Sequence, residues 1–100
     1  MNMQQMIAQA QKMQRELKKA KDALHEKEFV ESKAGLVTVT MLGSKEIKSI
    51  VINEEGFEKD NKEMVEELIV SAINELFEKI DEENDAINER ITGRAGGLGF

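Results

Sequence analysis

The chain contains no cysteine, tyrosine or tryptophan, and four phenylalanines are its only aromatic residues. Without cysteine, neither a disulfide framework nor a thiolate metal site can form. With so few aromatic side chains, the binding of bases by stacking on an aromatic platform has little to work with. The sequence also lacks a signal peptide pattern and any apolar run near the roughly 20 residues of a membrane span. We therefore expect a soluble protein of the cytoplasm.

Acidic residues outnumber basic ones, and the formal net charge of −6 counts against a polyanion as the partner. The charge is unevenly distributed, however. Residues 1–27 hold six basic and three acidic side chains, whereas residues 61–100 hold four basic and ten acidic ones. The only regional basic excess therefore lies at the start of the chain.

Residues 1–27 are predicted to form one long helix, because they contain neither proline nor glycine and are rich in Gln, Lys, Glu and Ala. Their apolar positions alternate in steps of three and four, which is the spacing of a narrow seam that packs along another helix. The seam consists of Met3, Met6, Ala10, Met13, Leu17, Ala20 and Leu24. So thin a stripe needs a helical partner. A chain of 100 residues buries a limited core, so a second copy of the chain is one plausible partner.

After this helix the pattern changes to that of strands. Residues 36–42 and 46–53 are rich in β-branched side chains and flank a turn at Gly43 and Ser44, which predicts a β-hairpin. A short run at Phe29 and Val30 is expected to add a third antiparallel strand. The fold class is therefore α+β, with a helix, a three-stranded antiparallel β-meander and a second long helix.

The second helix is expected to follow a capping box in which Asp60 is the N-cap and Glu63 reaches back. Its apolar stripe is broad enough to cover a sheet, and it then narrows up to Ile91 into a seam for a helical partner. We expect a single domain over residues 1–92 and a flexible, Gly-rich tail over residues 93–100.

No residue pattern in the chain indicates catalysis. His25 is the single histidine and is expected to be an ordinary surface residue without triad partners. Consecutive acids around Asp81 point in different directions on a helix, so a solvated face is preferred over a divalent cation site. The glycines from Gly93 onward lack the context of a phosphate loop. We expect neither enzymatic activity, metal, cofactor nor small-molecule substrate.

Two features of the first helix remain open. Lys12, Arg15, Lys18, Lys19 and Lys21 form a basic set, most of it opposite the seam, which either is simply solvated or meets a polyanion. The methionines of the seam are adaptable packing residues, and they either serve core or dimer contacts or offer a groove to client proteins.

The chain resembles the YbaB/EbfC family of bacterial nucleoid-associated proteins. The resemblance is carried by MQQM at 3–6, QAQKMQ at 9–14, GLVTVT at 35–40 with Gly43, EELIVSAIN at 66–74 and the Gly-rich end from Thr92. It implies a homodimer in which paired sheets form a central body and helices project from it like tweezers. It also implies binding of DNA in the cytoplasm and nucleoid with little sequence specificity, and no enzymatic activity.

Our leading hypothesis is accordingly a homodimeric DNA-binding protein that contacts backbone phosphates. The predicted contact residues, inferred from charge, are Lys12, Arg15, Lys18, Lys19, Lys21, Arg90 and Arg94. The alternative is a dimeric adaptor or holdase that grips proteins with its Met-rich helices.

Overall fold

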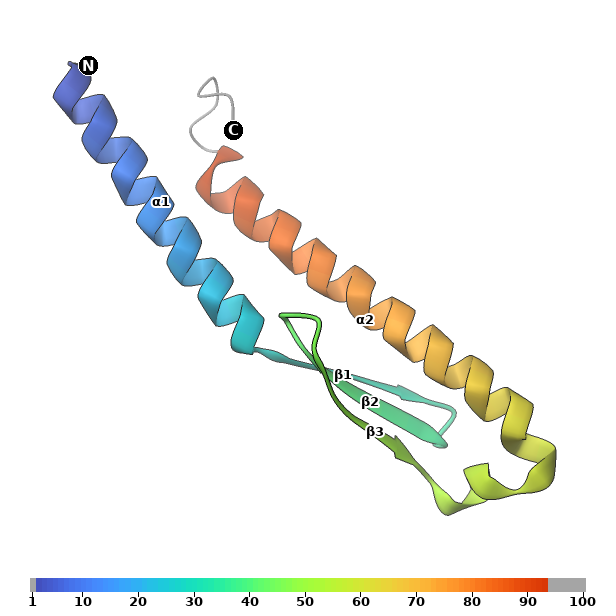
Figure 1. The fold of residues 1–100 in the computed structure, drawn as a ribbon. Helices are drawn as coiled ribbons and strands as arrows, with labels where there is room; N and C mark the ends of the chain where they lie inside the picture. Colours follow the sequence, from blue (N-terminus) through green and yellow to red (C-terminus); the bar gives the residue numbers. More distant parts are fainter. Residues whose placement is uncertain (1, 94–100) are drawn as a thin grey trace.

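The computed structural model describes residues 2–93 and confirms the predicted α+β fold. Helix α1 (Met3–Glu26) leads into strands β1 (Glu28–Lys33), β2 (Val37–Leu42) and β3 (Ile47–Ile52). Two short 3-10 turns, η1 (Glu54–Phe57) and η2 (Lys59–Asn61), precede helix α2 (Lys62–Ile91). Figure 1 shows that α2 lies over the sheet and then continues beside α1, which projects away from the sheet.

Helix α1 begins with a capping box formed by Asn2 and Gln5. The Asn2 side-chain oxygen accepts a hydrogen bond from the Gln5 backbone N–H at 2.8 Å. The Gln5 side-chain oxygen accepts in return from the Asn2 backbone N–H at 3.3 Å. The two bonds satisfy donors that a helix N-terminus otherwise leaves unpaired, so the helix is defined from its first turn.

The sheet is a meander in the order β1-β2-β3 with antiparallel pairing throughout. Its first hairpin closes at Ala34 and Gly35, whose φ angles of 53° and 67° belong to a type I′ turn. The Leu36 N–H completes the turn by donating to the Lys33 carbonyl oxygen at 2.9 Å. The predicted alternation in the central strand is confirmed, because its valines and Met41 are buried while its threonines are only partly covered.

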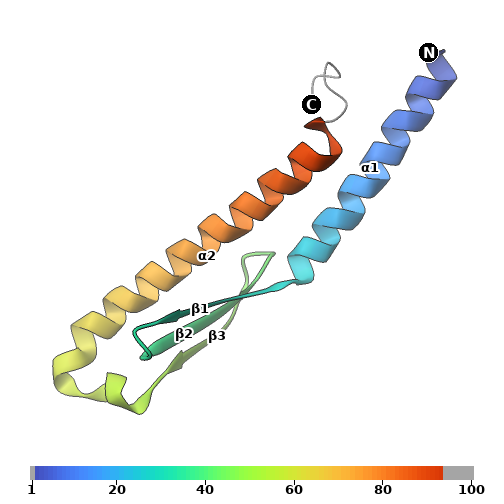
Figure 2. The ribbon, with the colours of Figure 1, turned by 180° about the vertical axis from the view of Figure 1, so that it is seen from behind.

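The core lies between the sheet and α2. Val39, Met41, Ala72 and Leu76 have no solvent-exposed surface at all. Both ribbon views show α2 running along one face of the sheet (Figures 1 and 2), where its contacts are with β1 and β2. Strand β3 lies at the edge without comparable cover, and its residues stay exposed or, at Ile52, half-buried.

The start of α2 corrects the predicted capping box. The N-cap is Asn61 rather than Asp60, and no side chain caps the helix. Instead, the Asn61 side-chain amide donates to the Glu55 carbonyl oxygen at 2.9 Å. The preceding η2 turn already has helical dihedral angles at Asn61, so the chain enters α2 without the extended residue that a capping box requires.

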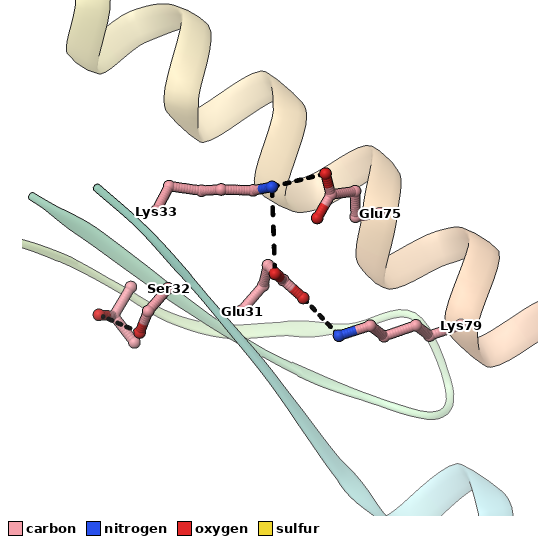
Figure 3. Close-up of polar contacts among 6 residues, drawn as sticks. Glu31, Ser32, Lys33, Glu75 and Lys79 are labelled. Carbon is pink, nitrogen blue, oxygen red and sulfur yellow. Dashed lines mark hydrogen bonds and ion pairs between the residues drawn. The ribbon is translucent and has the colours of Figure 1, made fainter. Parts of the chain in front are cut away.

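An ion-pair network fixes α2 on β1 (Figure 3). The Lys33 Nζ lies 2.5 Å from the Glu75 Oε1 and 4.0 Å from the Glu31 Oε1, and the Lys79 Nζ lies 2.5 Å from the Glu31 Oε2. The hydrogen bond from Lys79 holds the pKa of the Glu31 carboxyl below its usual value, and the same bond raises the pKa of Lys79. The network therefore favours the ionised form of the one carboxylate that faces both lysines.

Candidate nucleic-acid interface

The direction of α1 is set by the turn between β2 and β3, which closes against the C-terminal end of the helix. The Gly43 N–H donates to the Lys27 carbonyl oxygen at 2.9 Å, and the Ser44 N–H donates to the His25 carbonyl oxygen at 3.2 Å. These bonds satisfy backbone acceptors at the end of the helix. His25 therefore contributes its backbone, while its side chain is exposed.

Gly43 is required at this junction because the backbones approach too closely for any side chain. A Cβ at this position would lie 1.7 Å from the Leu24 carbonyl oxygen and 2.6 Å from its carbonyl carbon. The sequence predicted Gly43 in the turn of a β-hairpin, but no sequence pattern indicated its close contact with the end of α1.

The predicted seam of α1 is divided by the structure into two parts. Leu24 belongs to the hydrophobic core, and Leu17 and Ala20 pack against that core together with Ile91 of α2. Farther out, Met13 is buried and Ala10 is half-buried, whereas Met3 and Met6 are exposed. The helical partner of the sheet-proximal part is therefore α2 of the same chain.

A groove runs between α1 and α2 and brings together two of the predicted DNA-contacting residues. Lys19 and Arg90 line the same hollow, together with Glu16, Ala20, Ala23 and Ile91. Closer to the sheet, the groove is closed by Lys27, whose Nζ lies 2.6 Å from the Glu83 Oε1. Lys19 and Arg90 come from opposite ends of the chain, so only the fold makes them neighbours.

The other predicted cations differ in whether they already have a partner. The Lys12 Nζ lies 4.0 Å from Glu16, and the Lys18 Nζ lies 2.7 Å from Asp22, a hydrogen bond that raises the pKa of Lys18. Both pairs join successive turns of an exposed helix, where such pairs are weak and readily exchanged for another anion.

Within residues 2–93, no ion pair engages Arg15, Lys19, Lys21 or Arg90. Arg15, Lys19 and Arg90 are exposed, whereas Lys21 is half-buried. Lys21 follows Leu17 by four residues and precedes Leu24 by three, so helical spacing places it beside the seam rather than opposite it. Arg94 lies outside the described residues.

The acidic residues of α2 are partly engaged in ion pairs. Asp81 lies 2.8 Å from the Lys45 Nζ, and Glu83 pairs with Lys27, so these acids tie α2 to the β2–β3 turn and to the end of α1. In the part of the chain that the structure describes, no three His, Asp or Glu side chains form a group suited to a metal ion. No helix in that part has the length and apolarity to cross a membrane.

The fold and the charges together define a small α+β protein in which Arg15 and Lys19 of α1 and Arg90 of α2 are exposed and take part in no ion pair among the described residues. A family model described as the YbaB/EbfC DNA-binding family matches residues 1–95, and the chain belongs to this family.

Three relatives agree with this assignment, and each is named a nucleoid-associated protein. The chain is 41% identical to the protein of Enterococcus faecalis over 91% of this chain and 88% of the relative. It is 42% identical to that of Acetivibrio thermocellus, over 97% and 87%. It is 44% identical to that of Agathobacter rectalis, over 96% and 86%.

Proposed function

We propose that this chain is a nucleoid-associated protein of the cytoplasm that binds DNA as a homodimer. The observation that carries the proposal is the convergence of exposed Lys19 and Arg90 on one groove, with Arg15 close by on α1, in a chain that is otherwise acidic. Membership of a DNA-binding family names the polyanion that such a site would meet.

The mode of binding we propose is contact with backbone phosphates. Lysine and arginine on one face of an arm can position a duplex without reading its bases. The absence of tyrosine and tryptophan agrees with this mode, because it leaves little means of stacking on bases. The paired Lys12 and Lys18 would exchange their exposed carboxylate partners for phosphates as DNA approaches.

The test is a titration of DNA binding at several salt concentrations, with a defined duplex and a random duplex of equal length. We expect both duplexes to bind with similar affinity and to lose affinity with salt, with a log–log slope of about −0.9 for each phosphate contacted. A strong preference for one duplex, or an affinity that does not change with salt, would contradict backbone binding.

The homodimer is supported by the apolar surface that one chain leaves uncovered beside α2. Ile50 pairs with buried Val39 and so faces the α2 side of the sheet, yet it is 42% exposed. Beyond β3, Phe57 is 74% exposed, and Val70 of α2 is 59% exposed. An apolar edge strand of this kind invites association unless another element covers it. A second copy, which presents the same surface, would bury both.

Changing Ile50 to glutamate should therefore separate the dimer into single chains, because a carboxylate would have to be buried in the interface. Sedimentation should give twice the chain mass of 11.3 kDa for the unchanged protein and the mass of one chain for the variant. Ser49→Glu is the matched control, since Ser49 pairs with Thr40 on the other face of the sheet. An unchanged protein that sediments as one chain at micromolar concentration would rule out the dimer.

A further inference from the structure

The first two turns of α1 have no partner within the described chain. Ile91, the last residue of α2, lines the same hollow as Glu16 and Ala20, so α1 extends well beyond the end of α2. Over this extension Met3 is 75% exposed, and Met6 and Ile7 are each 51% exposed. The outer part of the predicted seam is therefore an exposed apolar surface at the N-terminal end of α1. We call the projecting helix α1 the arm and its residues 3–10 the tip.

The same tip lacks charged side chains. Charged residues make up 34% of the sequence, yet the first of them is Lys12. The polar positions of the tip are asparagine and glutamine instead. A DNA phosphate would meet no basic side chain here, so the proposed contacts of Lys19 and Arg90 do not account for this segment. A second tip, in contrast, could approach without the repulsion expected between copies of a chain with net charge −6.

We propose that the tip formed by residues 3–10 binds the tip of another copy. Helical spacing places Met3, Met6, Ile7 and Ala10 on one face, and Ala8 points away from it. A two-fold contact between two such faces is self-complementary, because each copy offers the same residues to the other. Methionine side chains adapt to an irregular partner, and the neighbouring glutamine amides can hydrogen-bond to one another.

A contact between two single tips has to be weak, so it would act only together with other contacts. Two helical turns bury far less than the roughly 800 Å² per partner of a standard interface. The association between dimers becomes stronger when two tip contacts form at once, or when DNA holds the dimers close to each other and raises their effective concentration. This consequence rests on the proposed function: dimers that bind DNA along their arms would join separate segments of DNA through their tips.

Disulfide trapping tests the contact directly, because the chain has no cysteine of its own. Ile7→Cys and Ala8→Cys change adjacent exposed residues, and the rotation of about 100° per residue in a helix places only Ile7 on the apolar face. Under the same mild oxidant and without DNA, we expect Ile7→Cys to form disulfide-linked chains at least tenfold faster than Ala8→Cys. Equal rates would overturn the proposal, since they would report random collision.

Sedimentation of the two variants then separates this proposal from the proposed dimer. Reduced Ile7→Cys should have the mass of the unchanged protein. Because each proposed dimer carries two tips, the oxidised variant should have at least twice that mass. An oxidised mass equal to the reduced one would place the disulfide inside a single dimer and would overturn association between dimers. A reduced mass of one chain would refute the β3 dimer alone, and doubling on oxidation would still support the tip contact.

Discussion

Replacing Gly43 with alanine should lower the free energy of unfolding by about 3 kcal/mol or more and detach α1 from the sheet. The new Cβ would lie 1.7 Å from the Leu24 carbonyl oxygen. No side-chain rotation can relieve this distance, because the backbone fixes the position of a Cβ and the carbonyl oxygen is itself a backbone atom. Moving the turn outward would break the bond from the Gly43 N–H to the Lys27 carbonyl. Either the clash or the lost hydrogen bond would weaken the contact between the β2–β3 turn and the end of α1, which sets the direction of α1.

Chemical denaturation followed by circular dichroism measures this effect. Ser44→Ala is the control, because Ser44 is exposed in the same turn and would retain its backbone bond to His25. We expect the control to remain within about 0.5 kcal/mol of the unchanged protein. An alanine at position 43 that is equally well tolerated would show that the turn and the end of α1 are not held in this contact.

The elements of the fold were predictable because each one carries a strong local periodicity. Val37, Val39 and Met41 alternate with threonines, and one face of this strand is buried as the alternation required. Likewise, α2 ends at Ile91, where its apolar spacing ends. The start of α2 was predicted wrongly because residues 54–61 fold by local 3-10 turns, in which Asn61 bonds back to Glu55 instead of capping.

The candidate site was less predictable, because its geometry depends on how two helices pass each other. Helical spacing alone could place Lys12, Arg15, Lys18 and Lys19 on the outer face of α1. It could not predict the position along α1 at which α2 ends. This position places Arg90 and Lys19 in the lining of the same hollow. The same packing of the two helices pairs Lys27 with Glu83, which is 56 residues away in the sequence, and no local sequence pattern predicts such a pair.

Under the proposed function, local charge would let an acidic chain bind a polyanion. Asp81 and Glu83 are held in ion pairs with Lys45 and Lys27, whereas Lys19 and Arg90 are exposed and unpaired among the described residues. Under that proposal, a duplex at the groove would meet Lys19 and Arg90 beside Glu16, while exposed charges farther away than about 10 Å are screened at 0.1 M salt.

The double variant Lys19→Glu with Arg90→Glu should consequently lower DNA affinity by on the order of 10- to 100-fold near 0.1 M salt. Two phosphate contacts would be lost, so the log–log salt slope should become shallower by about 1.8. Fluorescence anisotropy with a labelled duplex at several salt concentrations measures both quantities. Both changes lie in the same groove and each removes one cation from it, so the loss of DNA affinity should exceed that of either single change.

The control for net charge is Lys48→Glu with Lys62→Glu, which makes the same change in formal charge at exposed positions away from the arm. Lys48 pairs with Glu28 on the sheet, and Lys62 pairs with Glu66 at the start of α2. If location decides binding, this control keeps the salt slope of the unchanged protein and loses little affinity. If both double variants lose affinity equally, long-range charge governs binding, and the groove between α1 and α2 is not the DNA interface.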